Sequence, residues 1–221
     1  MILEENEEEE VRKLSIHFFQ CVQNNNLCEI IKIFRNESIK PWEFLLEDGF
    51  SGLHKAVFLE YYLLICTMID EMKIRLGVDA EKEIQKFVNK KTNKEGNSAL
   101  HFASYLGNID IIKILIENKA EVLICNFSGN NVLHMAAKGN NANSFIYFKE
   151  KFNINIESTD DINSTPLHRA CFFGSDLVTN FILSFNVNIN HKDKEGFTPL
   201  HLAVIAGKIK IIKEIIKIFF R

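Results

Sequence analysis

The stretch that decides the fold is Thr165-Pro166-Leu167-His168-Arg169-Ala170, which recurs 33 residues later as Thr198-Pro199-Leu200-His201-Leu202-Ala203. Leu-His pairs also occur at three earlier places, each with Ala two residues after His. The last four pairs are separated by 33, 34 and 33 residues. A fixed period of this length is the mark of a stacked repeat architecture. The five pairs are Leu53-His54, Leu100-His101, Leu133-His134, Leu167-His168 and Leu200-His201.

Each copy predicts the same local structure. Thr before Pro is a helix N-cap followed by a proline at the first helical position. Seven residues after the Leu, most copies carry a residue that tolerates the left-handed conformation ending a helix. These residues are Gly107, Asn140, Gly174 and Gly207, whereas the first copy has Glu60, which leaves its helix junction open. A second apolar run and a polar stretch follow, so each unit is predicted as helix, tight turn, helix and polar loop.

The repeated hexapeptide and its period resemble the ankyrin-repeat family, whose signature is Thr-Pro-Leu-His-x-Ala at about 33 residues. The resemblance implies an all-α ankyrin-repeat solenoid of about six stacked helix-turn-helix units with connecting hairpin-like loops. It also implies that the repeat His braces the loop by hydrogen bonds, so the five Leu-His pairs are predicted to be structural. Imidazoles on helices about 10 Å apart cannot share one metal ion at ~2 Å, and we therefore predict no metal site.

The period also predicts the domain organisation. Phe18 lies 35 residues before Leu53 and marks a divergent first unit at about 15–47, after an acidic N-terminal tail over residues 1–14. Later units start near residues 48, 93, 126, 160 and 193, so the repeat domain covers residues 15–221. The spacing of 47 residues between Leu53 and Leu100 exceeds one period. We place the surplus within 71–92, as a longer second helix or an extra short helix, serving as a surface insertion or a contact surface.

Composition narrows the function classes. The chain has 221 residues, 47% hydrophobic content and a net charge of -3, which argues against a nucleic-acid partner. Five cysteines without close metal-type pairing are read as buried thiols of a reducing compartment: Cys21, Cys28, Cys66, Cys125 and Cys171. The acidic start differs from a signal peptide, and no apolar run approaches the ~18 residues of a membrane span. We expect a cytoplasmic protein, with the nucleus as the alternative location.

The sequence carries no motif of catalysis. It contains neither a Gly-rich phosphate loop nor a nucleophile elbow, so we expect no enzyme, no cofactor and no small-molecule substrate. The rival hypothesis is a cryptic enzyme, which would need a reactive Cys next to a His outside the repeat set, such as His17 or His191.

The ankyrin resemblance implies a protein-binding adaptor or scaffold, whose unidentified protein partner contacts the concave face. In that family the contact positions are the exposed end of the first helix and the loop tips. Apolar and aromatic residues there predict a binding patch, although several could instead pack inward. The predicted partner-binding residues are Phe58, Leu59, Tyr105, Leu106, Phe127, Ile162, Phe172, Phe173, Phe197 and Ile205. The pair Lys138-Gly139 interrupts this series.

The C-terminal stretch from Lys208 to Arg221 supports an alternative function. Its lysines recur every three or four residues among Ile and Phe. They could form the outer stripe of a self-capping helix, or the stretch could be a docking edge for a second copy, a partner helix or an anionic membrane. The alternative is therefore a self-associating or membrane-peripheral module acting through this amphipathic helix, with a membrane as the less favoured partner.

Overall fold

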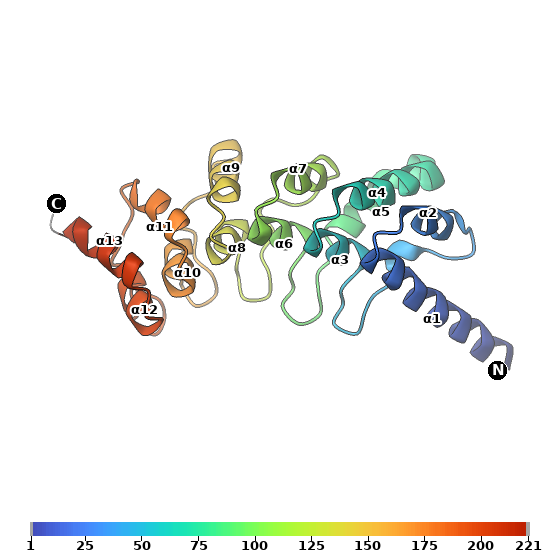
Figure 1. Ribbon diagram of the computed structural model, residues 1–221, viewed down its shortest axis with the longest axis horizontal. Coiled ribbons are helices and arrows are strands. Elements are labelled where there is room, and N and C mark those ends of the chain that lie inside the picture. Colours follow the sequence, from blue (N-terminus) through green and yellow to red (C-terminus); the bar gives the residue numbers. More distant parts are fainter. Residues whose placement is uncertain (1, 220–221) are drawn as a thin grey trace. The chain divides into compact units, whose positions relative to one another are not determined.

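The computed structural model describes the backbone of residues 2–219 and the side chains of residues 9–218. Within this part the regular elements are helices, together with two isolated antiparallel bridges, Leu45 with Ser51 and Lys91 with Ser98. The predicted all-α class is confirmed. The chain divides into two compact units, coloured along the sequence in Figure 1. Unit 1 comprises Met1–Ala99 with Lys113–Ala120, and unit 2 comprises Leu100–Ile112 with Glu121–Arg221.

Unit 1 contains the divergent first repeat and the second repeat. Its elements are α1 (Ile2–Gln23), α2 (Leu27–Arg35), η1 (Pro41–Glu43), α3 (Gly52–Phe58), α4 (Tyr62–Leu76), η2 (Gly77–Asp79), α5 (Ala80–Val88) and the end of α7 (Ile109–Glu117). Helix α1 packs on α2 and α3, and α2 packs on α4. The buried rings of Phe18, Phe34 and Trp42 form an aromatic core, with ring centroids 6.2 Å and 6.0 Å apart in sequence order. Phe18 therefore fills the place that Leu fills in the later repeats.

The acidic start of the chain is helical. Helix α1 begins at Ile2, so residues 2–14, which we expected to form a tail, extend the first helix of the first repeat. Glutamates near a helix N-terminus are favourable because they face the positive end of the helix dipole. The Lys13 ammonium also lies 2.8 Å from the Glu9 carboxylate, one turn away. The side chains of Glu4, Glu5, Glu7 and Glu8 lie outside the described part of the structure.

The surplus residues of the second repeat form both of the structures that we had considered. Helix α4 is 15 residues long, and the additional helix α5 follows it after a turn at Gly77, which has a positive φ of 54°. Helix α5 packs against α4. Its far end is held by the side-chain amide of Asn89, which donates a 2.8 Å hydrogen bond to the Lys119 carbonyl after α7.

Unit 2 holds the later repeats as stacked helix pairs. Its elements are most of α6 (Ala99–Leu106), the start of α7, α8 (Val132–Lys138), α9 (Ala142–Phe152), α10 (Pro166–Phe173), α11 (Asp176–Leu183), α12 (Pro199–Ile205) and α13 (Ile209–Phe219). Helix α10 packs between α8 and α12, and α11 packs between α9 and α13. Helices α10 and α12 start directly after their predicted cap residues, Thr165 and Thr198, and α8 starts after Asn131 at the same place in its repeat.

The helix ends also follow the sequence pattern. Gly107, Asn140, Gly174 and Gly207 all have positive φ, as expected for a left-handed helix end. Glu60 adopts the same conformation, with φ 58°, so the first Leu-His copy forms its junction without the favourable residue type.

The cysteine prediction was wrong in part. Cys21 and Cys171 are buried, but Cys28 and Cys125 are exposed and Cys66 is half-buried. Cys28 lies in the first turn of α2, and Cys125 lies in the loop between α7 and α8.

Two further expectations concern membrane-spanning helices and the C-terminal end of the chain. None of the helices within residues 2–219 is long and apolar enough to cross a membrane. Phe220 and Arg221, which belong to the predicted C-terminal docking edge, lie outside the described residues.

Candidate functional site

The repeat histidines tie neighbouring repeats together. The backbone N–H of the N-cap residue donates to Nδ1 of the same repeat's His, as from Thr165 to His168 at 3.1 Å. Because Nδ1 accepts this bond, Nε2 carries the proton and donates to a loop carbonyl of the next repeat. These Nε2 contacts are His54 to Lys90 at 3.0 Å, His101 to Asn130 at 3.0 Å, His134 to Ser164 at 3.0 Å and His168 to Phe197 at 3.2 Å. These four histidines make the kind of loop contact that the ankyrin resemblance implies.

Burial keeps the braced imidazoles neutral. Desolvation lowers the pKa of His54 and of His134 to about 4, and it lowers the pKa of His168 as well. The conserved spacing also places the accompanying leucines in the core, since Leu53, Leu100, Leu133 and Leu167 are all buried. The first four Leu-His pairs therefore contribute to the packed interior, whereas Leu200 is half-buried and His201 is exposed.

One Cys-His pair outside the repeat set lies close together. The Sγ atom of Cys21 is 3.6 Å from Nε2 of His17, one turn earlier on α1. Burial and, to a smaller extent, the nearby Glu29 raise the pKa of the Cys21 thiol. A nucleophilic cysteine needs a lowered pKa, so this environment shifts the thiol in the direction opposite to activation.

The predicted partner-binding residues differ in exposure. Those on the surface are Phe58 in unit 1 and Phe127, Ile162, Phe172, Phe173 and Ile205 in unit 2. Those that are half-buried are Leu59, Tyr105, Leu106 and Phe197. Tyr105 is half-buried because α8 approaches closely: a Cβ on Gly139 would collide with the Tyr105 carbonyl oxygen, to which the Asn141 side-chain amide also donates. Hydrogen bonds hold the backbone of Phe197. Its N–H donates to the Asp193 carboxylate, and its carbonyl oxygen accepts from His168 Nε2.

In unit 2 the exposed aromatics form a cluster at the end of α10. The rings of Phe172 and Phe173 lie edge to face with centroids 5.2 Å apart. The ammonium group of Lys138, at the end of α8, lies 5.2 Å from the Phe173 ring centroid, a cation–π contact. Lys138, which we had taken as an interruption of the apolar series, thus joins it through its charge. Sequence spacing did not reveal this contact because the two residues belong to different repeats.

The loop tips are linked by backbone hydrogen bonds within each unit. In unit 2 the N–H of Asp161 donates to the Ser128 carbonyl at 3.1 Å, and the N–H of Lys194 donates to the Ile162 carbonyl at 2.9 Å. In unit 1 the N–H of Asn93 donates to the Asp48 carbonyl at 2.9 Å. Successive tips are therefore fixed relative to one another, which reduces the ordering cost of binding.

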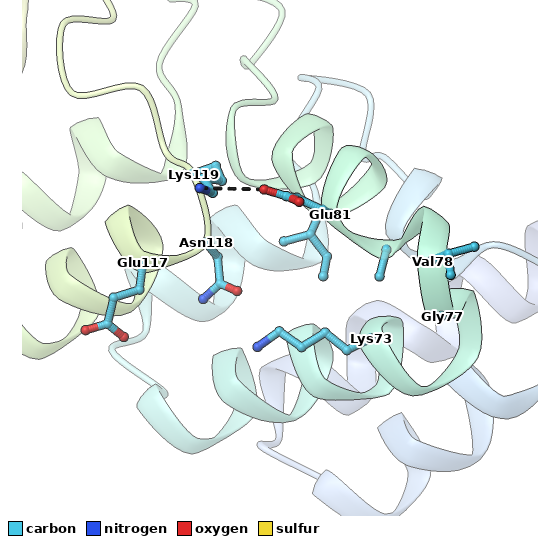
Figure 2. Close-up of a pocket in the computed structure, with 9 residues that line it drawn as sticks. Lys73, Gly77, Val78, Glu81, Glu117, Asn118 and Lys119 are labelled. Atoms are coloured by element: carbon cyan, nitrogen blue, oxygen red, sulfur yellow. Dashed lines mark ion pairs between the residues drawn. The ribbon is translucent and has the colours of Figure 1, made fainter.

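The insertion forms a groove in unit 1 that the sequence did not predict. Its volume is about 450 Å³, and Figure 2 shows the side chain of Lys73 pointing across it toward Asn118. The lining residues are Lys73, Gly77, Val78, Ala80, Glu81, Ile84, Glu117, Asn118 and Lys119. An ion pair of 3.5 Å joins Lys119 to Glu81 along one wall. The sequence did not predict the groove because its two walls lie far apart in the chain. The end of α7 and the residues after it form one wall, more than thirty residues after Ile84 on the other wall.

Comparison with known proteins agrees with the repeat geometry. The family model described as ankyrin repeats (3 copies) matches residues 18–124, 74–160 and 133–219. The chain is also similar to the Notch-regulated ankyrin repeat-containing protein of Xenopus tropicalis, with 30% identity over 79 residues. That similarity covers 32% of this chain and 69% of the relative.

Proposed function

Because this chain belongs to the ankyrin-repeat family, whose repeats are general protein–protein interaction modules, we propose that it binds a partner protein through its first-helix ends and loop tips. In an ankyrin array these positions line the concave face. The family is typically non-catalytic, and we propose that this chain acts as a non-catalytic adaptor or scaffold in the cytoplasm.

The observation that carries the proposal is the exposed apolar cluster of unit 2. Phe172 and Phe173 are each about two-fifths exposed although they stack on one another, and Ile205 of the next repeat is 60% exposed. Exposed aromatics in one cluster are the usual anchors of binding hot spots. Lys138 beside them adds a cation that can pair with an acidic group at the rim of a partner.

The loops support the same surface. Ile162 and Lys194 belong to adjacent tips that are hydrogen-bonded through their backbones, so the tip surface is preorganised. A partner that covers both the cluster and the tips would meet apolar anchors in the centre and charged groups at the edge, the usual arrangement of a protein interface.

The test is a quantitative pull-down from cell lysate with a triple variant, Ile162→Glu, Phe172→Glu and Ile205→Glu. All three side chains are exposed and lie on the proposed surface. A buried carboxylate at a hot spot is strongly unfavourable, so we expect specific partners to fall at least about tenfold in recovery. Thermal melts would first establish that the variant folds as the wild type does.

The matched control places the same charges on exposed apolar residues at or after the ends of α4 and α7, outside the first-helix ends and loop tips: Ile74→Glu, Val78→Glu and Leu123→Glu. The control should retain the partners that the first variant loses. If both variants retain the same proteins as the wild type, the proposed surface is not the binding site.

A further inference from the structure

Among the described residues, none covers the face of the α12–α13 repeat that corresponds to a buried face of the preceding repeats. Three positions define it, which lie one, four and twelve residues after the repeat Leu. In the two preceding repeats of unit 2 these positions are at most 1% exposed: His134, Ala137, Phe145, His168, Cys171 and Thr179. In the last repeat His201 is exposed, Val204 is 58% exposed and Ile212 is half-buried. The last repeat thus carries the residue types of a packed face in an uncovered position.

His201 also has the geometry of the bracing histidines. Its Nδ1 accepts from the Thr198 backbone N–H at 3.1 Å, as in the earlier repeats, which leaves the proton on Nε2. Among the described residues the structure records no acceptor for this Nε2. His201 Nε2 is therefore a hydrogen-bond donor at the position where the His of each earlier repeat contacts the next repeat.

Helix α13 continues this face as two parallel rows. Ile209, Ile212 and Ile216 recur at the three- and four-residue spacing that places side chains on one face, and Ile209 is 65% exposed. Beside them Lys210, Lys213 and Lys217 form an exposed row at the same spacing. Like charges at this spacing destabilise a helix, although Glu214 pairs with Lys217 at 2.7 Å. The open end face is defined here as His201, Val204, Ile209, Ile212 and Ile216 with the row Lys210, Lys213 and Lys217.

The start of α1 has the complementary composition. Residues 4–10 include six glutamates, and the described residues from Glu9 to Lys13 are all exposed. Figure 1 shows the dark-blue start of α1 reaching beyond the other helices of unit 1. Glutamates at this density repel one another along a helix, and neighbouring lysines would relieve the repulsion. Val11 adds an exposed apolar side chain to this acidic arm, defined as residues 2–14.

We propose that the acidic arm of one copy of this protein binds the open end face of a second copy. Glutamates of the arm pair with the lysine row, and a carboxylate oxygen accepts the hydrogen bond of His201 Nε2 in place of a loop carbonyl. Val11 packs against the exposed Val204 and Ile209. The contact joins two different surfaces, so it is heterologous and leads to rings or open chains. It uses none of the residues proposed for partner binding and stands independently of that function.

Sedimentation velocity of the full chain tests the association. We expect the weight-average mass to rise with concentration between about 1 and 200 µM at about 50 mM salt. At about 500 mM salt the rise should largely disappear, because screening weakens exposed ion pairs. A mass that stays at one monomer over the whole range would overturn the proposal. A contact between the two ends of a single chain would leave the mass independent of concentration and would also overturn it.

Charge exchange identifies the surfaces. The variant Lys210→Glu, Lys213→Glu carries acidic residues on both surfaces. The variant Glu5→Lys, Glu7→Lys, Glu8→Lys, Glu10→Lys has a net positive arm in addition to its lysine row. Each alone should associate at least about tenfold more weakly than the wild type. An equimolar mixture of the two should recover association, and so should one chain carrying all six substitutions.

The matched control is Lys82→Glu with Lys113→Glu, which changes the same charge at exposed positions elsewhere. It should associate like the wild type. Equal weakening by the control, or no recovery in the mixture, would show that net charge or another surface is responsible. Cosedimentation of a monomeric wild type with phosphatidylserine vesicles would assign the open end face to a membrane and overturn the proposal.

Discussion

At the end of α3, Glu60 occupies a backbone conformation that the other repeats assign to Gly or Asn. Its φ of 58° lies in the left-handed region, like those of Gly107, Asn140 and Gly174. A side chain with a Cβ pays about 1 kcal/mol for this conformation, because the Cβ approaches the following carbonyl oxygen. The junction nevertheless forms, with the Tyr61 N–H donating to the Ala56 carbonyl at 2.9 Å.

We therefore predict that Glu60→Gly raises the free energy of unfolding by about 0.5–1 kcal/mol. The control is Asn140→Gly, at a nearly identical φ of 57°. Asn140 donates to the Asp176 carboxylate and accepts from the Leu177 N–H, so its replacement should lower stability. Urea denaturation of the two variants measures the change in the free energy of unfolding for each. Destabilisation by Glu60→Gly would mean that the contacts of Glu60 outweigh its backbone strain.

For single residues, the structural role could be predicted from the sequence, but the exposure of the side chain could not. The resemblance to ankyrin repeats implies the bracing role of His54 and His134, and each imidazole donates a hydrogen bond to a loop carbonyl. The half-burial of Tyr105 depends on Gly139 one repeat later, whose lack of a side chain lets the helices approach. Such pairings between repeats are set by three-dimensional packing and leave no signal in the spacing.

At the scale of elements, one ion pair links α2 to α4 inside unit 1. The Arg35 guanidinium donates to both oxygens of the Glu71 carboxylate at 2.8 Å, and Glu71 is buried. A bidentate contact to a buried carboxylate is stronger than a surface pair. By contrast, the nearby pair of Lys32 and Glu29 lies on the exposed side of α2.

We predict that Arg35→Ala lowers the free energy of unfolding, because Glu71 is left buried without its cation. Because the Arg35 side chain is largely exposed, the loss of stability should be smaller than for a fully buried ion pair. Lys32→Ala should lower the free energy of unfolding much less than Arg35→Ala, because its pair with Glu29 lies in solvent. Equal losses in the two variants, measured by urea denaturation, would show that the buried carboxylate finds water or another partner.

The boundaries of elements were predictable where a cap residue marks them. Thr165 and Thr198 start α10 and α12 where the sequence indicates. The beginning of α1 could not be predicted, because a run of glutamates has neither a cap residue nor apolar periodicity. Glu is nevertheless a good helix former. The helix that continues from the packed residues Phe18 and Val22 extends into this run without a break.

At the scale of the whole chain, the period predicted the order of helices but not the groove beside the insertion. Lys73 and Asn118 reach this groove from different repeats because α5 displaces the regular packing of the second repeat. The period has a second consequence, since it places a buried histidine in successive repeats. The stability of the chain therefore depends on a set of imidazoles that must stay neutral.

The sign of the resulting pH dependence follows from the lowered pKa values. Folding lowers the pKa of His54 and His134 from an ordinary 6.5 to about 4, so the unfolded chain binds more protons between these values. Their contribution is complete above pH 6.5 and is lost as the pH falls toward 4. The free energy of unfolding should fall by up to about 1.4 kcal/mol per pH unit for each of the two imidazoles.

Urea denaturation between about pH 7 and pH 5, where most carboxylates stay ionised, measures this slope. His134→Gln should reduce the slope by up to one proton, since glutamine does not titrate. The control His17→Gln changes an exposed histidine on α1 that takes no part in the bracing contacts to loop carbonyls. An unchanged slope in His134→Gln would contradict the prediction, because it would place the titrating groups outside the bracing contacts. A reduced slope would identify His134 as one of the groups whose protonation lowers the stability of the fold in acid.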